Sequence, residues 1–218
     1  MVLFSGSDLS CLRGERLVFR ALSFALAPGE ALLLTGANGS GKSSLLRLMA
    51  GLTPAITGKL SWQGFEIGKD RAAYRRQLHF IGHLDAVKPA LTVTETLSFW
   101  GALNGAEAAA VRRALERFRL APLAASPCRH LSAGQKKRLS LSRLLAASAP
   151  LWLLDEPTTG LDRDSVADLE AAIAEHRAGG GIVVASTHTP LALEGARNCL
   201  LTDYAPRRAK DNDDEYQS

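Results

Sequence analysis

Short apolar runs alternate along this chain with segments whose apolar residues recur at helical spacing. The runs carry β-branched and aromatic residues or end at glycine, which is typical of buried strands. They cover residues 17–26, 30–36, 59–64, 78–83, 150–157 and 181–188. Helical spacing covers residues 40–52, 92–104 and 107–120 and a segment that begins at Ser132. Because strands and helices alternate, the pattern predicts an α/β fold with a mostly parallel sheet.

The stretch from about 88 to 148 interrupts this alternation, because its periodicity is mainly helical. We therefore predict an inserted helical subdomain there, within one domain that spans residues 1–204. The remaining residues, 205–218, are charged and show no periodicity. We expect this tail to be disordered.

The composition is that of an ordinary globular protein, with 46% hydrophobic and 22% charged residues among 218. A net charge of +4 fits an anionic ligand or a membrane surface, although a generic protein surface is the simpler interpretation. Cys11, Cys128 and Cys199 form no paired framework and indicate a reducing compartment. The chain shows no signal peptide and no apolar run near the ~20 residues of a membrane span. We expect a cytoplasmic protein that reaches a membrane only through partners.

Residues 36–43, GANGSGKS, match the phosphate-binding pattern G-x-x-x-x-G-K-[ST] between a predicted strand and a predicted helix. Its glycines permit positive φ values, so that backbone N–H groups can converge on phosphates at the helix N-terminus. Lys42 is expected to reach the β- and γ-phosphates, and the Ser43 hydroxyl to bind Mg²⁺. The predicted phosphate loop consists of Gly36, Ala37, Asn38, Gly39, Ser40, Gly41, Lys42, Ser43 and Ser44.

Two adjacent carboxylates follow four apolar residues in the run LWLLDEP. Asp155, at the predicted strand end, is expected to hold Mg²⁺ through a water. Glu156 follows directly and is expected to orient and deprotonate an attacking water. His188 ends the run GIVVASTH. Taken alone it is an ordinary strand-end histidine, but in a phosphate-site protein it is a candidate catalytic contact for the γ-phosphate.

The order of these motifs resembles the nucleotide-binding subunits of ABC transporters over roughly residues 3–203. LSAGQ at 131–135 resembles the family signature LSGGQ, with Ala133 at its third position, and GLD at 160–162 resembles the family's D-loop. The resemblance implies a P-loop NTPase with a RecA-like, mostly parallel sheet core. It also implies an N-terminal antiparallel β part and the inserted α-helical subdomain.

In that family the signature helix serves the nucleotide of a second subunit. The resemblance therefore implies a second copy of this chain in a head-to-tail dimer with two ATP molecules between the copies. A helix N-terminus with a serine hydroxyl is a suitable second anion site. The residues implied to contact the ATP of the partner subunit are Ser132, Gly134, Gln135 and Asp162.

Two positions depart from the usual pattern of the family. A glutamine normally ends the strand before the helical subdomain, and alignment of the segment LTVTETL places His83 there. An aromatic residue normally stacks on adenine, and this chain has Arg13 at that position. A guanidinium can also stack on adenine, but Arg13 can equally be a solvated surface residue. His79 and His83 lie four apart on a predicted strand, hence on one face, where structural histidines are commoner than haem ligands.

The combined motifs narrow the resemblance to one subfamily. C-x-R-G-E-R, the GH of IGH, K-P-x-L-T, LSAGQ and LWLLDEP resemble the ATP-binding subunit of the haem-handling ABC complex of bacterial cytochrome c maturation. The GH dipeptide is usual there, so His83 matches that subfamily. The resemblance implies ATP and Mg²⁺, and integral membrane partners of the CcmB, CcmC and CcmD kind at the cytoplasmic face of the inner membrane. ATP hydrolysis would drive release of a haem-loaded periplasmic chaperone, or haem export in an older interpretation.

Three alternatives stay open at this point. An ABC ATPase for another cargo would normally carry glutamine at position 83 and an aromatic residue at position 13. A small-molecule P-loop kinase would leave LSAGQ unexplained. A non-transport ABC protein acting on DNA or ribosomes usually has two cassettes or long coiled-coil insertions. We expect no nucleic-acid partner, since one basic cluster is more simply a solvated or phosphate-facing helix surface: Lys136, Lys137, Arg138 and Arg143.

Overall fold

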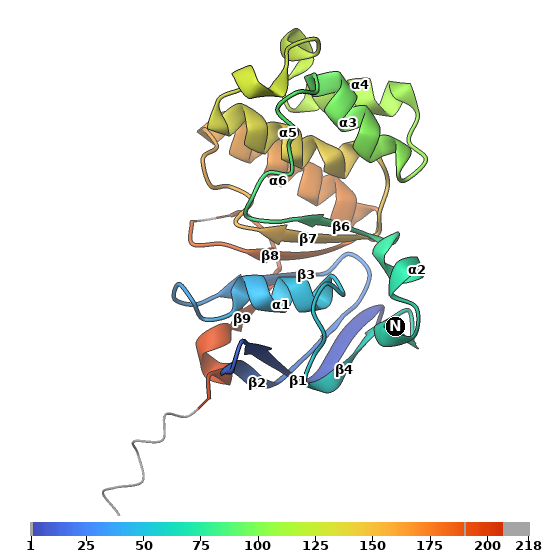
Figure 1. Cartoon of the computed structure of the whole chain (residues 1–218). Helices are drawn as coiled ribbons and strands as arrows, with labels where there is room; N and C mark the ends of the chain where they lie inside the picture. The colour runs from blue at the N-terminus through green and yellow to red at the C-terminus, as the bar shows by residue number, and fades with distance from the viewer. Residues whose placement is uncertain (1, 190, 207–218) are drawn as a thin grey trace, which may run out of the picture.

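The computed structural model describes residues 2–189 and 191–206, whose strands form two sheets (Figure 1). The parallel sheet has the strand order β6-β7-β8-β3-β9, and these strands are Leu78–Ile81, Leu151–Asp155, Ile182–Ser186, Ala31–Thr35 and Arg197–Leu200. The antiparallel sheet has the order β2-β1-β4-β5, and these strands are Arg16–Leu26, Phe4–Arg13, Thr57–Trp62 and Phe65–Glu66. The predicted parallel core and the antiparallel N-terminal part are both confirmed.

The helices form two layers on the parallel sheet (Figure 1). Helix α1 (Lys42–Met49) lies between the two sheets, and α2 (Arg71–Arg75) lies at one end of the parallel sheet. The opposite face is covered by α3 (Val93–Ala102), α4 (Ala108–Arg117), α5 (Ala133–Ala146) and α6 (Arg163–Ala178). Short 3-10 helices are Ile67–Lys69, Ala121–Leu123, Cys128–His130 and Leu201–Tyr204. Helices α3, α4 and α5 pack on one another, while their grouping into a subdomain over about 88–148 stays a prediction.

Alternate residues of the central strands enter two separate cores. In β7, Trp152 and Leu154 join the core beneath the upper helices, while Leu151 and Leu153 join the core around α1 and the antiparallel sheet. All four side chains are buried. Burial on both faces explains why the sequence shows continuous apolar runs rather than alternation in these strands.

The predicted strands and helices are confirmed, with differences of one to a few residues at their ends. Five of the described strands and α-helices were not predicted, namely β1, β5, α2, α6 and β9. Strand β1 carries serines, a glycine and several register shifts against β2, which hide its periodicity. Helix α6 buries small residues beside Leu169 and Ile173, so its apolar stripe is weak in the sequence. Strand β9 is an edge strand with largely exposed residues.

The prediction that His79 and His83 share one face of a strand is wrong, because β6 ends at Ile81. His79 is buried, and its Nε2 lies 2.9 Å from the carbonyl oxygen of Ala147, where burial lowers the pKa of the imidazole. His83 is exposed in the loop that follows the strand. His79 is therefore a structural residue of the core.

The predicted disorder of residues 205–218 falls, from residue 207 onward, outside the described residues. None of the helices in 2–189 and 191–206 combines the length and the apolar character that crossing a bilayer requires.

Candidate nucleotide-binding site

The phosphate loop connects the end of β3 to the start of α1. Three of its glycines have positive φ values, 131° at Gly36, 80° at Gly39 and 107° at Gly41. Gly41 also passes so close to β2 that an added Cβ would collide with the side chain of Val18. Any other residue at position 41 would thus destabilise the loop for two reasons, namely backbone strain and the lack of space for a side chain. The loop thereby brings its backbone N–H groups to the first turn of α1.

The ammonium group of Lys42 lies within this loop. Lys42 Nζ donates hydrogen bonds to the carbonyl oxygens of Gly36 at 2.8 Å and Ala37 at 3.1 Å. The side chain is buried, with 5% of its surface exposed. A buried ammonium is costly without acceptors, and the two carbonyls supply them. The positive charge is thereby positioned among the backbone groups expected to bind phosphate.

Asp155 lies at the end of β7 and accepts hydrogen bonds from two hydroxyl groups. Ser43 Oγ donates to Asp155 Oδ1 at 3.0 Å, and Ser186 Oγ donates to the same oxygen at 2.8 Å. Asp155 pairs with Ser186 in the register of β7 and β8, and its side chain is 2% exposed. Hydroxyl and carboxylate oxygens are the hard donors that Mg²⁺ prefers. The Ser43–Asp155 pair is therefore chemically suited to that ion.

Glu156 and His188 form a second pair beside the first. His188 Nε2 lies 3.2 Å from Glu156 Oε1, and the backbone N–H of His188 donates to Glu156 Oε2 at 3.2 Å. Glu156 has a φ of 50°, a value that residues other than glycine rarely adopt. Its backbone N–H donates to both the carbonyl and the hydroxyl oxygen of Ser186, which holds this conformation. Its carboxylate consequently points differently from that of Asp155.

These groups line a cavity of about 600 Å³. Predicted residues in its wall are Arg13, Asn38, Gly39, Gly41, Lys42, Ser43, Ser44, His83, Glu156 and His188. The remaining loop residues, Gly36, Ala37 and Ser40, and the buried Asp155 do not line it themselves. The structure therefore brings the phosphate loop, Glu156, His188, His83 and Arg13 to one place.

The signature residues are not part of this cavity. Ser132 caps α5, where its hydroxyl accepts from the N–H of Gln135 at 3.2 Å and its own N–H donates to Gln135 Oε1 at 2.8 Å. Asp162 caps α6 by accepting a hydrogen bond from the N–H of Ser165 at 2.8 Å, and hydrogen bonds from Ser165 lower the pKa of its carboxyl. The described residues that line the cavity do not include Ser132, Gly134, Gln135 or Asp162. Within one chain, the signature residues therefore lie apart from the cavity formed by the phosphate loop and the acids.

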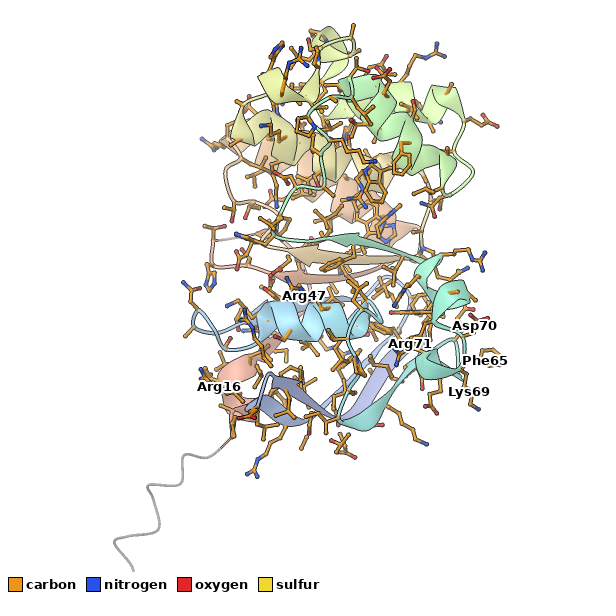
Figure 2. All side chains as sticks on the ribbon, in the orientation of Figure 1. Arg16, Arg47, Phe65, Lys69, Asp70 and Arg71 are labelled. Carbon is orange, nitrogen blue, oxygen red and sulfur yellow. The ribbon has the colours of Figure 1, made fainter. Side chains whose placement is uncertain are left out.

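Four further residues line the cavity and were not predicted, namely Arg16, Val18, Thr159 and Thr189. Arg16 stands opposite Arg13 across the β1–β2 turn, at the lower left of the molecule in Figure 2. Arg13 was assigned to the nucleotide site only through the resemblance to the ABC family. Since the sequence did not predict β1, it could not predict that Arg13 pairs with Arg16. Ser186, which supports both acids, was detectable as the polar residue that ends an apolar strand.

The comparisons with known proteins agree with this geometry. A family model described as ABC transporter matches residues 19–159. A protein of Rhodospirillum rubrum called "Cytochrome c biogenesis ATP-binding export protein CcmA" is 56% identical over 204 residues, which cover 94% of this chain and 88% of that protein. A protein of the same name from Paramagnetospirillum magneticum is 52% identical, with coverage of 93% and 95%.

The fold also matches a solved structure, titled as the dimeric, post-hydrolysis state of an ATP-binding cassette with ADP and Pi. Its TM-score is 0.77 at 22% identity, with 86% of this chain and 88% of that chain covered. The family match, the two relatives and the fold agree with the phosphate loop and paired acids described above. The chain therefore belongs to the ABC transporter family, in its group of cytochrome c biogenesis ATP-binding proteins.

Proposed function

We propose that this chain hydrolyses ATP through the Ser43–Asp155 and Glu156–His188 pairs and thereby drives a step of cytochrome c biogenesis at the inner membrane. The observation that carries the proposal is the meeting of the phosphate loop with both pairs at one cavity of a chain from this family. Backbone N–H groups and Lys42 would hold the phosphates. Ser43, and Asp155 through a water, would hold Mg²⁺, which supplies neutralisation of charge on the phosphates.

Glu156 is suited to act on the attacking water. Its carboxylate stands beside the Ser43–Asp155 pair, with 14% of its surface exposed, and can accept the proton that the water loses as it attacks the γ-phosphorus. His188 contacts this carboxylate through its ring and through its backbone N–H, and it would also contact the γ-phosphate. Arg13 lines the same cavity, and its stacking on adenine stays a prediction.

We further propose the assembly in which this chemistry is used. A second copy would place Ser132, Gly134, Gln135 and Asp162 on the ATP of the partner subunit, since these residues stand apart from the cavity of their own chain. Membrane subunits of the CcmB, CcmC and CcmD kind would hold the dimer at the cytoplasmic face. ATP hydrolysis would then drive release of the haem-loaded periplasmic chaperone, or haem export through the same complex.

The function is tested by replacing the chain in a bacterium whose own gene for it has been deleted. We expect the deletion strain to lose haem-stained c-type cytochromes, the intact chain to restore them and the Lys42→Ala chain to fail, because a neutral loop binds triphosphate poorly. A matched control is Lys69→Ala. Lys69 is exposed and lies on the side of the molecule opposite to Arg16, a residue of the cavity wall (Figure 2). Restoration by Lys42→Ala, or normal cytochromes in the deletion strain, would contradict the proposal.

His83 is expected to connect hydrolysis to the membrane partners. It lines the cavity from the loop after β6, and that loop leads directly into α3. We expect His83→Ala to leave ATP affinity of the isolated chain nearly unchanged and to reduce the stimulation of hydrolysis by partners about tenfold, within the usual range of coupling between sites. The measurement is ATP hydrolysis by the chain alone and by the complex purified with its membrane subunits.

The matched variant is His83→Gln, because glutamine is the usual residue of the wider family at this position and keeps a polar side chain of similar reach. We expect it to retain most of the stimulation. An equal loss of activity in the isolated chain and in the complex would show that His83 acts on nucleotide chemistry alone.

A further inference from the structure

Three threonine hydroxyls lie close to His188, and the sequence did not single out any of them. Thr158 follows Glu156 by two residues, in the loop between β7 and α6. Thr187 and Thr189 flank His188 just after the end of β8. Thr158 Oγ1 lies 2.8 Å from Thr189 Oγ1, so the two hydroxyl groups share a hydrogen bond. This bond joins the loop that follows Glu156 to the residue next to His188.

The hydroxyl of Thr187 closes the turn in which His188 lies. It donates a hydrogen bond to the carbonyl oxygen of Thr189 and accepts one from the backbone N–H of Thr189 at 3.1 Å. Both backbone groups of Thr189 are thus bonded to a side chain two residues earlier, as in other turns built on serine or threonine. Only 7% of the surface of Thr187 is exposed, so the turn is anchored at the buried end of β8. His188 therefore stands between two residues that are bonded to each other.

Thr158 is the buried member of the hydroxyl pair, whereas Thr189 is exposed. Only 7% of the surface of Thr158 is exposed, and its carbonyl oxygen accepts a hydrogen bond from the N–H of Leu161 at 3.1 Å. The next residue, Thr159, donates its N–H to the carbonyl oxygen of Glu156 at 3.3 Å. The loop after Glu156 therefore has its own internal hydrogen bonds. The hydroxyl pair ties the exposed turn after β8 to this bonded loop.

The contact between His188 and Glu156 needs such a restraint, because the imidazole is largely in solvent. The side chain of His188 is 42% exposed, while that of Glu156 is 14% exposed. Contacts of exposed charged or polar groups contribute little, because water competes for them and the side chain loses rotamer freedom. The distance of 3.2 Å between ring and carboxylate does not by itself fix the imidazole. A backbone that is held on both sides of His188 leaves the ring fewer positions.

We propose that Thr158 is a positioning residue of the ATPase site: through the hydroxyl of Thr189, it holds the turn that presents His188 to Glu156. Thr189 and His188 line the cavity, and Thr158 is not among the described residues that do so. Thr158 therefore acts on the bound nucleotide only through the residues that it holds. This inference rests on the proposed roles of Glu156 and His188 in hydrolysis.

The first test is Thr158→Val, which replaces the hydroxyl by a methyl group of similar size. We expect kcat for ATP to fall about 3- to 10-fold, the range that corresponds to the loss of one neutral hydrogen bond. KM is expected to stay within about threefold, because the phosphate loop is unchanged. Thr158→Ser keeps the hydroxyl and is expected to keep kcat within about twofold of the unmodified chain.

The matched control is Thr96→Val. Thr96 is also buried, and its hydroxyl lies 3.3 Å from Cys128 Sγ in the packing of α3. It is not among the described residues that line the cavity. The control therefore removes a buried threonine hydroxyl from another part of the chain, and we expect kcat within about twofold of the unmodified chain.

The second test asks whether Thr158 acts through His188. In a His188→Ala chain there is no ring left to position, so adding Thr158→Val is expected to change the remaining kcat by less than about twofold. Thr189→Val removes the other hydroxyl of the pair at an exposed position and is expected to lower kcat as much as Thr158→Val does. Circular dichroism checks that each chain folds, and Thr189→Val takes the place of Thr158→Val in every comparison if the latter does not.

Three results would each overturn the proposal: a Thr158→Val chain with kcat within twofold of the unmodified chain, a Thr158→Ser chain as slow as Thr158→Val, or an undiminished effect of Thr158→Val in the His188→Ala chain. The proposed function fails by a different measurement. If His188→Ala or Glu156→Gln hydrolyses ATP as fast as the unmodified chain, the role of that residue in hydrolysis is wrong. If both are slow and Thr158→Val is not, only the positioning role of Thr158 fails.

Discussion

A Glu156→Gln chain is expected to bind MgATP with nearly unchanged affinity and to hydrolyse it about 10²–10⁴ times more slowly, the usual effect of losing a general base. Glutamine has the shape of glutamate, and its amide oxygen can still accept the hydrogen bond from the backbone N–H of His188. The unusual φ of 50° at this position imposes the same backbone cost on both residues. The substitution removes the negative charge that faces His188 Nε2 and, with it, the ability to take a proton. Single-turnover hydrolysis and equilibrium nucleotide binding measure the two effects separately.

The matched control for this variant is Glu175→Gln. This control variant makes the same substitution at an exposed position of α6, where Glu175 Oε1 lies 2.8 Å from the guanidinium of Arg117. Exposed ion pairs contribute little to stability, so this chain is expected to fold and to hydrolyse ATP normally. Hydrolysis by Glu156→Gln within a few-fold of this control would remove Glu156 from the role of base and leave His188 as the remaining candidate.

The sequence was sufficient for the parts of the site that depend on local chain order. The phosphate loop is one contiguous stretch between β3 and α1, so residue spacing alone defines it. Asp155 and Glu156 are adjacent at the end of an apolar strand, and burial of two acids there already indicated a cation site. Ser132 and Gln135 form the predicted helix start, with both reciprocal hydrogen bonds in place. In each case the chemistry and the backbone conformation are set within a few residues.

The parts that the sequence did not reveal depend on pairing between distant segments. Arg16 reaches the cavity because β1 and β2 pair, and β1 has no clear periodicity. The sequence indicates a solvated Lys137 because its neighbours on both sides are charged, yet helix packing buries this residue and leaves 5% of its surface exposed. Gly134 also differs from a freely exposed first turn, since a Cβ there would lie 3.0 Å from the carbonyl oxygen of Gly160. These contacts join segments that are distant in the sequence, so the local pattern of residues does not predict them.

Close packing at Gly134 decides how the signature is best tested. A side chain there would press on the loop of Gly160, so a loss of function could come from a displaced backbone. Ser132 is exposed, and among residues 2–189 and 191–206 its hydroxyl bonds only to the N–H of Gln135, as the cap of α5. Aspartate and asparagine both cap helices as well as serine does. Ser132→Asp and Ser132→Asn therefore keep the helix start and differ from each other only in charge.

We expect Ser132→Asp to abolish the ATP-dependent dimer. In a Glu156→Gln background, MgATP should trap a dimer of two chains with ATP between them, because hydrolysis no longer releases it. A carboxylate at position 132 would face the γ-phosphate held by the partner subunit, and two like charges about 4 Å apart repel by about 4 kcal/mol at the effective dielectric of a protein surface. Each of the two ATP sites of the dimer carries this repulsion, so the association constant falls by about three orders of magnitude per site. Gel filtration with light scattering in MgATP measures the dimer fraction.

The Ser132→Asn chain in the same background decides what that loss means. It has the same size as the aspartate variant and lacks the charge, so we expect it to retain most of the dimer, with ATP bound equally by both monomers because Lys42 and its loop are unchanged. If both variants lose the dimer, the side chain at 132 is too large and charge is not the cause. If both keep it, α5 does not meet the nucleotide of the partner subunit, and LSAGQ must act within its own chain. Only loss with aspartate and retention with asparagine places an anion opposite Ser132, which is the arrangement that a shared ATP site requires.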